Sequence, residues 1–454
     1  MDTKKLRQKI LDLAIRGKLV PQDPNDEPAS VLLERIRAEK EQLIKEGKIK
    51  RSKKSVASDT SHYENYELPQ GWTYATMSDI CTKIVDGDHN PPIAQKAESE
   101  YIMISSKNVV NDSIIHLDDV RHLSRADFEL SNARTQVSKG DVLFTSVASL
   151  GRTCIYDLDY PITFQRSVTV ICTKIFNRYL KLFLDSPLYQ NYVGENARGT
   201  AQKGFYINQI SDSWVPIPPL NEQIRIVEKA QSLLDIVQII NYSKEETSNN
   251  IIALKSKILD LAISGKLVRQ DKSDEPAIEL LKRINPQYQP TDNRHYKNLP
   301  ETWEEVELGV ICQLFDGKKV IDKELVNLDV KYLRGSKEGD KLSSGKYVRK
   351  DALMILVDGE NSGEAFITPH EGYQGSTFKQ LNIYPELNRD YVLLLIQHSR
   401  ELLKDNKVGS AIPHLNKKLF KQIHVPIPPY NEQERIVQTV RTIMFKLDEI
   451  LADL

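Results

Sequence analysis

Apolar residues recur at alternating spacings of four and three between Pro219 and Pro276, a stretch that contains no other proline. Such a seam is typical of a helix that packs along one side against another helix. It predicts one helix over residues 221–264, about 65 Å long at about 1.5 Å per residue, with Gly265 as a helix-ending glycine. The seam residues are Ile226, Ala230, Leu233, Val237, Ile240, Lys244, Thr247, Ile251, Leu254, Ile258 and Leu261, interrupted by the polar Lys244 and Thr247.

A second seam with the same spacings is divided between the two ends of the chain. Its parts are Ile436, Val440, Ile443, Leu447, Ile450 and Leu454, and then Leu6, Ile10 and Leu13 ahead of Gly17. The chain therefore looks like a near-cyclic arrangement cut in the middle of one long helix. We expect the termini to meet in space and the two long helices to pair antiparallel. The alternative, two amphipathic helices packed in separate domain cores, is less favoured because the two seams match.

The segments 62–218 and 292–428 have a different pattern. Short β-rich runs are separated there by Gly, Asn, Asp and Pro, as expected of strands and turns. The predicted strands lie within 101–110, 140–147, 162–171, 330–335, 352–357 and 378–384, and short helices near 178–193 and 390–404. We predict that each segment is a compact α+β domain.

Three sets of internal repeats show that the chain is two copies of one unit. KILDLAIRGKLVPQDPNDEPASVLLERI (9–36) matches KILDLAISGKLVRQDKSDEPAIELLKRI (257–284). VPIPPLNEQIRIV (215–227) matches VPIPPYNEQERIV (425–437), and LPQGW (68–72) matches LPETW (299–303). The fold class that follows is α+β: two similar domains separated by long antiparallel coiled-coil helices, with a pseudo-two-fold internal repeat.

These patterns predict seven consecutive segments. They are an N-terminal helical region (1–36), a basic linker (37–61), the first domain (62–218), the central long helix (219–270), a second linker (271–291), the second domain (292–428) and a C-terminal helix (429–454).

Composition narrows the class of protein. The 454 residues carry 62 Lys and Arg against 63 Asp and Glu, a net charge of −1. This balance excludes a histone-like basic protein but leaves room for a local DNA-binding groove. No apolar run approaches 18 residues and the N-terminus is charged, so we expect a cytoplasmic protein with no membrane contact. The four cysteines form no CxxC pair, so we expect reduced thiols and no metal site.

Polar side chains suited to base edges or phosphates fall in or beside the predicted turns. For any one of them a solvated loop residue is the favoured interpretation, whereas the set as a whole supports DNA contact better than its single members do. The basic stretch 45–54 could be either a tether or a phosphate contact. The candidates are Lys83, Asp88, His89, Asn90, Lys107, Asn108, Arg152, Gln165, Arg166, Gln202 and Lys203 in the first domain, and Lys318, Lys319, Arg334, Lys337, Asn361, Lys379, Gln380, His414 and Asn416 in the second.

Catalytic motifs are weak or absent. Residues 90–93 resemble the NPPY/F motif of amino-methyltransferases, but the aromatic position is Ile93 and no FxGxG loop exists, so we interpret them as a turn. The chain also lacks GxxxxGK[ST], GxSxG and HExxH sequences. We predict no catalytic residue.

The chain resembles the DNA specificity subunit of type I restriction–modification systems. The resemblance is carried by the paired PIPPxNEQ motifs, KILDLAIxGKLV, DEPAxxLL, LPxxW and GDVLF (140–144), and by Gly199-Thr200-Ala201 matched with Gly409-Ser410-Ala411. It covers essentially the whole chain. Family members often begin near LPxxW, so this chain looks circularly permuted.

The resemblance implies that each domain is a target recognition domain that reads one half of a bipartite, asymmetric site in double-stranded DNA. It implies a non-catalytic subunit that recruits two adenine methyltransferase subunits and two restriction–translocase subunits. The cofactors S-adenosylmethionine, ATP and Mg²⁺ would then be used by those partners and none by this chain. The alternatives are a protein-only coiled-coil scaffold and a self-contained methyltransferase or nuclease.

The NEQ motifs are the candidate partner-binding residues. We expect the asparagines to cap their helices, the glutamates to lie in the first turn, and the surrounding helix face to dock a partner. The residues are Asn221, Glu222, Gln223, Asn431, Glu432 and Gln433.

Overall fold

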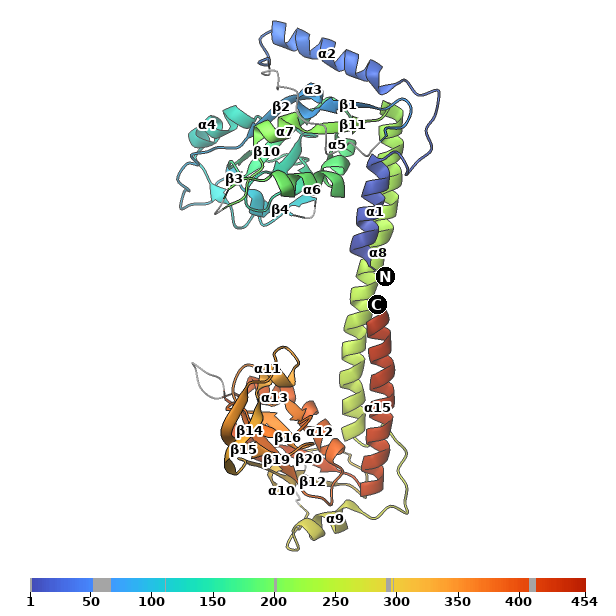
Figure 1. The fold of residues 1–454 in the computed structure, drawn as a ribbon, viewed down its shortest axis with the longest axis vertical. Helices are drawn as coiled ribbons and strands as arrows, with labels where there is room; N and C mark the ends of the chain where they lie inside the picture. The colour runs from blue at the N-terminus through green and yellow to red at the C-terminus, as the bar shows by residue number, and fades with distance from the viewer. Residues whose placement is uncertain are drawn as a thin grey trace. The chain divides into compact units, whose positions relative to one another are not determined.

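The computed structural model of the chain describes residues 2–51, 67–110, 112–199, 202–290, 295–296, 298–407 and 414–454. It divides the chain into two compact units, unit 1 from Met1 to Ser243 and unit 2 from Lys244 to Leu454. Each unit combines long helices with a mixed domain of short strands and helices (Figure 1). The predicted α+β class with two similar domains is confirmed.

The described residues of unit 1 form four sheets and a 3₁₀ turn, η2 (Ser106–Asn108). The strand orders are β1-β11, β2-β10-β7-β8, β6-β3-β9 and β4-β5. Its strands are β1 (Thr73–Thr76), β2 (Cys81–Asp86), β3 (Ile102–Ile104), β4 (Val109–Val110), β5 (Ser113–Ile114), β6 (Arg121–His122), β7 (Val142–Thr145), β8 (Thr153–Ile155), β9 (Ile162–Phe164), β10 (Val168–Thr173) and β11 (Trp214–Ile217). Its helices are α1 (Thr3–Ile15), α2 (Ala29–Lys45), α3 (Met77–Ile80), α4 (Arg125–Thr135), α5 (Asn177–Leu184), α6 (Pro187–Asn196), α7 (Ile207–Asp212) and the first half of α8 (Leu220–Ile263).

Unit 2 repeats the first two sheets as β12-β20 and β13-β19-β16-β17, and adds a small closed barrel, β14-β15-β18. Its strands are β12 (Glu304–Glu307), β13 (Cys312–Phe315), β14 (Lys319–Leu328), β15 (Lys341–Val348), β16 (Leu353–Leu356), β17 (Ala365–Ile367), β18 (Gly372–Gln374), β19 (Phe378–Ile383) and β20 (His424–Ile427). Its helices are the rest of α8, α9 (Ala277–Ile284), α10 (Leu308–Ile311), α11 (Val330–Leu333), α12 (Arg389–His398), α13 (Arg400–Asp405), α14 (Lys417–Gln422) and α15 (Tyr430–Asp453).

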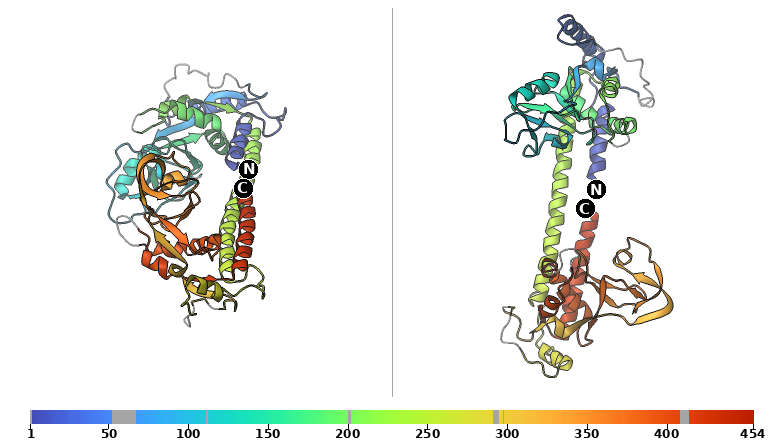
Figure 2. Two further views of the ribbon diagram at one scale, coloured as in Figure 1. Left: turned by 60° about the horizontal axis from the view of Figure 1, so that its bottom comes forward. Right: turned by 90° about the vertical axis from the view of Figure 1, so that its left-hand side faces the viewer.

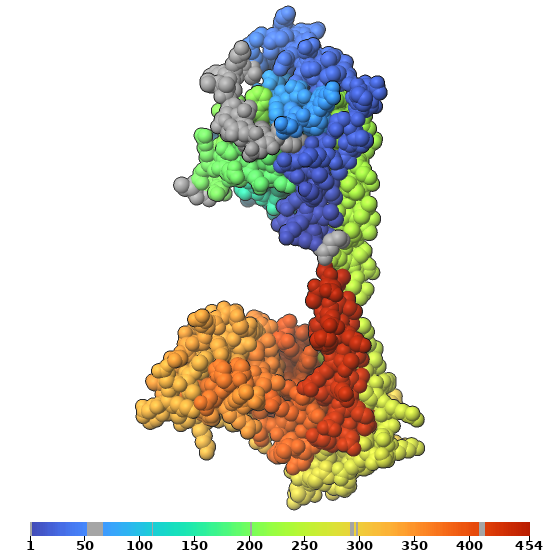
Figure 3. Space-filling view, turned by 45° about the vertical axis from the view of Figure 1, so that its right-hand side comes forward, coloured from blue at the N-terminus to red at the C-terminus, as the bar shows by residue number. Residues whose placement is uncertain are grey.

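Each unit packs a second helix along part of α8 (Figure 3), and this helix runs in the opposite direction (Figure 2). In unit 1, Thr3 at the start of α1 bonds to Asn241 near the end of that part of α8. In unit 2, Lys255 of α8 bonds to Asp448 near the end of α15. The central helix and the antiparallel pairing are therefore confirmed within each unit, and the apolar seams line these contacts.

Helix α8 ends as predicted, and the equivalent helix α1 ends in the same way. Gly265 and Gly17 have φ of +69° and +62°, a conformation that favours glycine. A Cβ added at Gly17 would lie 2.5 Å from the Pro69 ring, so the close approach of the LPxxW segment also requires glycine here. Two seam residues depart from the prediction, because Leu254 is 46% and Ile450 48% exposed.

Three other predictions need correction or stay open. Residues 330–335 are not a strand, because the Asp329 side chain accepts the amides of Lys331 and Tyr332, both at 2.9 Å, and begins α11. Helix α2 extends through Lys45 into the predicted linker 37–61, and α9 lies within the predicted linker 271–291. Residues 52–66 and Met1 lie outside the described residues, so the meeting of the termini stays a prediction.

The cores are built around the repeated motifs. In unit 1, α1, α2, the β1–β11 pair and α5–α8 enclose one cluster that includes Trp72, and a smaller cluster lies beneath β3 and β9. Unit 2 has an equivalent large cluster around Trp303 and a smaller one beside the barrel. No helix in the described ranges is long and apolar enough to cross a membrane.

Candidate nucleic-acid interface

The four-stranded sheet of unit 1 brings several loops together at one end of its strands. Strands β2 and β7 end there, while β10 and β8 begin there. Residues 202–204 lie at the same end of the sheet, because the amide of the next residue, Phe205, donates to the carbonyl of Ser146 at 2.8 Å. We call this loop surface edge 1. It consists of residues 87–90, 146–152, 165–167 and 202–204.

Unit 2 forms the same surface with the same backbone bonds. The amide of Leu415 donates to the carbonyl of Val357 at 2.7 Å, the equivalent of the bond described for edge 1. The amide of Val357 in turn donates to Thr377 at 2.8 Å, as that of Ser146 does to Ser167 at 3.0 Å. We call this surface edge 2. It consists of residues 316–318, 357–364, 375–377 and 414–416.

The edges collect many of the predicted DNA-contacting residues. Edge 1 carries Asp88, His89, Asn90, Arg152, Gln165, Arg166, Gln202 and Lys203. Edge 2 carries Lys318, Asn361, His414 and Asn416. The others lie on neighbouring strands and loops: Lys83, Lys107, Asn108, Lys319, Arg334, Lys337, Lys379 and Gln380. Edge 1 thus holds most of the residues predicted in the first domain, whereas edge 2 holds only four of the nine predicted in the second.

Four basic side chains at or beside these edges are available to an anion. Arg166 and Lys203 on edge 1, and Lys318 and Lys319 at edge 2, are exposed. None of them forms an ion pair within the described part of the chain. Exposed, uncommitted Lys and Arg side chains are those best placed to contact phosphates without rearrangement.

Other predicted cations are already paired within the fold. The pairs are Lys83 with Asp141, Lys107 with Asp119, Arg334 with Glu364, Lys337 with Asp340, Lys379 with Asp316, and His414 with Asp358. The ammonium groups of Lys346 and Lys379 hold the pKa of Asp316 well below its usual range. These cations would have to exchange a carboxylate for a phosphate to bind DNA.

Burial contradicts a base-reading role for two predicted residues. The Asn108 side chain is 0% exposed, and its amide donates to the carbonyl of His116 at 3.0 Å. Gln380 is 6% exposed and donates to the carbonyl of Tyr347 at 2.8 Å. Asn416 has a structural role as well, because its side chain caps α14. The Asn108 side chain holds a loop in place, the Gln380 side chain connects strand β19 to strand β15, and neither faces solvent.

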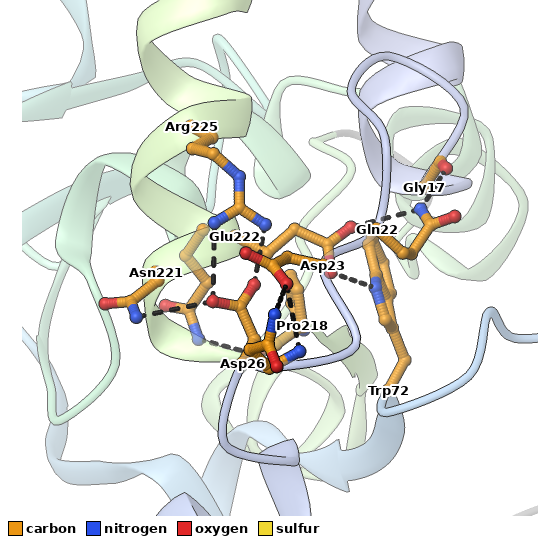
Figure 4. A network of polar contacts seen from close by, with 11 residues as sticks. Gly17, Gln22, Asp23, Asp26, Trp72, Pro218, Asn221, Glu222 and Arg225 are labelled. Atoms are coloured by element: carbon orange, nitrogen blue, oxygen red, sulfur yellow. Dashed lines mark hydrogen bonds and ion pairs between the residues drawn. The ribbon is translucent and has the colours of Figure 1, made fainter.

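The repeated motifs meet away from the edges, in a polar network that includes a buried glutamate (Figure 4). Glu222, which is 1% exposed, accepts the indole N–H of Trp72 at 3.0 Å and the side-chain amide of Gln22 at 3.2 Å. Gln22 also donates to the carbonyl of Gly17 at 2.6 Å. One carboxylate thereby connects the NEQ, LPxxW and GKLV motifs.

A second carboxylate connects the DEPA motif to the same helix. The Asp26 carboxylate accepts the guanidinium of Arg225 at 2.6 Å and the amide of Asn221 at 3.3 Å (Figure 4). The hydrogen bond from Arg225 lowers the pKa of Asp26. We call this network junction 1. It consists of Gly17, Gln22, Asp26, Trp72, Asn221, Glu222, Gln223 and Arg225.

Unit 2 builds the same network, junction 2, from the repeated residues. Glu432 accepts the indole of Trp303 and the amide of Gln270, each at 3.0 Å. Asp274 accepts Arg435 at 2.6 Å. The members are Gly265, Gln270, Asp274, Trp303, Asn431, Glu432, Gln433 and Arg435. Burial raises the pKa of both Glu222 and Glu432, although their hydrogen-bond donors offset part of that rise.

The glutamines of the NEQ motifs are buried connectors to the variable domains. Gln223 is 0% exposed, donates to the carbonyl of Pro218 at 2.9 Å and accepts the amide of Phe176 at 3.0 Å. Gln433 does the same with Pro428 and Asn388. Each glutamine thus fixes the start of its helix to the domain that precedes it.

These contacts correct the role predicted for the asparagines. Asn221 and Asn431 lie within the first turn of their helices, and Pro429 occupies the N-cap of α15. Their side chains bond to Asp26 and Asp274 and do not cap the helices. The glutamates do lie in the first turn, as expected. Partner binding by the NEQ residues stays a prediction.

The residues missed by sequence reasoning are the partners within each junction. Gln22, Asp26, Trp72 and Arg225 lie inside repeated strings, but nothing in one copy alone indicates which of them meet. The available signal was that each of these polar residues is identical in the second copy. Polar identity in both copies suggests side chains that bond to each other, although the apolar strings around them, such as KILDLAI and PIPP, are identical as well.

A family model for the type I restriction modification DNA specificity domain matches residues 69–248 and 300–452. The Escherichia coli EcoAI type I specificity subunit is 27% identical over an alignment that covers 99% of this chain and 89% of that protein. The Escherichia coli EcoEI specificity subunit is 31% identical over 62% of this chain and 54% of its own length.

Solved structures share the fold. One of them comes from a structural study of complex assembly and conformational transition of the type I R-M system. It matches with a TM-score of 0.59 and 16% sequence identity, and the match covers 86% of this chain and 94% of that chain. The HsdS subunit from Thermoanaerobacter tengcongensis has a TM-score of 0.50 and 18% identity, over 86% and 93% of the two chains. The near-complete EcoAI alignment indicates that this order of segments is shared, and circular permutation relative to other members stays a prediction.

Proposed function

Because this chain belongs to the family of type I restriction–modification specificity subunits, we propose that it reads a bipartite, asymmetric site in double-stranded DNA. Each recognition domain would read one half of the site through its edge. A specificity subunit is not itself an enzyme, and the catalytic activities of such systems lie in partner subunits.

Support comes from the two edges. Each edge lies on its own four-stranded sheet, and the two sheets have the same strand order and equivalent backbone hydrogen bonds. The exposed side chains of the two edges nevertheless differ. Edge 1 presents Arg166 and Lys203, whereas edge 2 presents Lys318 and Asn361. The same scaffold with different donors and acceptors is what two unequal half-sites require, because base identity is read by side-chain hydrogen-bonding patterns.

The partners are part of the proposal. Two adenine methyltransferase subunits and two restriction–translocase subunits would assemble on this chain, and they would use S-adenosylmethionine, ATP and Mg²⁺. The junctions support a docking role for the nearby helix faces, because they hold the start of α8 or α15 rigidly against its recognition domain. A partner docked there would be held at a fixed position relative to the edge.

Adenine-methylation mapping tests the proposal. DNA is compared from cells that carry the methyltransferase subunit with and without this chain. We expect a bipartite methylated motif only when the chain is present. Methylation that is independent of the chain, although the two proteins copurify, would favour the protein-only scaffold. Methylation by the purified chain with S-adenosylmethionine alone would favour a self-contained methyltransferase.

A further inference from the structure

Three potential metal ligands converge beside the β12–β20 strand pair of unit 2. Glu305 lies on β12, His424 begins β20, and His295 precedes both. The Nδ1 atoms of both histidines lie 2.9 Å from the same carboxylate oxygen, Oε1 of Glu305. One ligand atom from each residue lies within 4.8 Å of the other two.

Backbone amides fix the orientation of the Glu305 carboxylate. The Glu305 side chain is 0% exposed, and its oxygens accept the amide of His295 at 2.9 Å and that of Tyr296 at 3.0 Å. A buried, oriented carboxylate with fixed outer hydrogen bonds is the arrangement that metal ligands commonly have.

His424 has a buried ring nitrogen without a hydrogen bond. The Nδ1 atom of His424 is buried and has no properly directed hydrogen-bond partner among the described residues, although Oε1 of Glu305 is close. The two imidazole rings stack with centroids 3.8 Å apart, and both Nδ1 atoms lie 2.9 Å from the same oxygen, but only that of His295 forms a hydrogen bond to it. Two nitrogen atoms therefore compete for a single acceptor, a conflict that a cation placed between them would resolve.

The first copy of the repeat shows that the strand pair does not need these groups to fold. Tyr74 stands at the position of Glu305, and Trp214 at that of His424. Their rings pack edge to face with centroids 6.5 Å apart. The strand registers are equivalent, since Thr76 pairs with Trp214 as Glu307 pairs with His424. The ionisable cluster is thus specific to unit 2.

We propose that His295, Glu305 and His424 form a binding site for one divalent transition-metal ion of the Zn²⁺ class. Two imidazole nitrogens and one carboxylate oxygen are ligands that Zn²⁺ accepts, with bonds of about 2.0–2.2 Å. Tetrahedral bonds of that length separate ligand atoms by about 3.3 Å. The 2.9 Å separations would therefore open by about 0.4 Å, and the stacked rings would tilt apart.

The site would fasten the chain ahead of β12 to the β12–β20 pair. His295 is exposed, which leaves the fourth coordination position to water.

Metal titration of the full-length, chelator-stripped chain tests the proposal. Co²⁺ absorption reports the ligand set, and competition with a chelator gives the Zn²⁺ affinity. We expect one tight equivalent per chain. Because loss of an outer hydrogen bond alone costs about 10–100-fold in affinity, the variants His295→Ala and His424→Trp should each weaken Zn²⁺ binding more than 100-fold. The second variant installs the residue of the first copy.

A matched control is His398→Ala, because His398 is also a histidine paired with a single carboxylate, Asp260, at 3.0 Å. This variant should keep the wild-type affinity. Absence of a tight equivalent, or equal loss in the His398 variant, would overturn the proposal. The exposed His295 keeps the test informative if His424→Trp fails to fold, which circular dichroism would reveal.

Discussion

Replacing Glu222 with alanine should destabilise unit 1 by about 2 kcal/mol. The change removes the acceptor of the Trp72 indole N–H, 3.0 Å away, in a position where Trp72 is only 8% exposed. A buried donor left without a partner costs about 1–3 kcal/mol. Gln22 loses one bond but keeps another to the carbonyl of Gly17 at 2.6 Å, so its loss is smaller.

An opposing contribution keeps the expected loss moderate. Burial raises the pKa of Glu222, which means that the folded chain disfavours its ionised form. Removing the carboxylate relieves that cost at neutral pH. The net loss is therefore set mainly by the unpaired Trp72 donor.

Urea-dependent hydrogen exchange followed by mass spectrometry measures this loss in each unit separately. With an m-value of about 3 kcal/mol per M, a loss of 2 kcal/mol lowers the unfolding midpoint of unit 1 peptides by about 0.7 M. Glu432→Ala is the matched control and should shift unit 2 peptides instead. An unchanged midpoint, or equal shifts in both units from Glu222→Ala, would refute the structural role of junction 1.

Two further predictions concern single charges. Asp26→Asn should lower stability at pH 7, because the hydrogen bond from Arg225 lowers the folded pKa of Asp26. The difference from wild type should begin to shrink as the pH falls below the ordinary aspartate value of 3.8 and disappear only below the folded pKa. Urea midpoints at pH 7 and at a series of pH values below 3.8 check this, and a constant difference would contradict it. Arg166→Ala should weaken DNA binding by the assembled complex and reduce the slope of log K against log salt concentration by about 0.9. The control Lys337→Ala should leave the slope unchanged, because Lys337 is already paired with Asp340. Equal slopes in the two variants would argue against DNA contact by edge 1.

Long-range periodicity made the helices predictable. The spacing of apolar residues from Ile226 to Leu261 extends over many turns, and helix α8 matches the predicted range within one residue at each end. The paired repeats likewise made the two-domain organisation predictable. These signals are redundant along the chain, so local exceptions such as the exposed Leu254 do not change the outcome.

Side-chain burial in loops was not predictable in the same way. Asn108 and Arg166 are both polar residues beside predicted turns, yet one is buried and the other exposed. Their difference depends on which distant loop packs over them, and no local pattern encodes that. The small barrel in unit 2 and the helix that begins after Asp329 depend on similar tertiary and capping contacts.

The partners within the junctions illustrate an intermediate case. Repetition marked the strings that contain Trp72 and Glu222, but pairing them required the fold to bring chain positions 150 residues apart into contact. A second copy with the same residues indicates that these positions matter, but it does not indicate which side chains bond to each other. The His295–Glu305–His424 cluster lacked even that signal, because the first copy has different residues there.

Exchange of residues 62–218 for the equivalent segment of another specificity subunit tests the central claim most directly. The measurement is the adenine-methylation motif in cells that carry the hybrid chain with its methyltransferase subunit. We predict that one half of a bipartite motif changes while the other half is retained. A motif that changes in both halves, or does not change at all, would contradict the assignment of one half-site to each recognition domain.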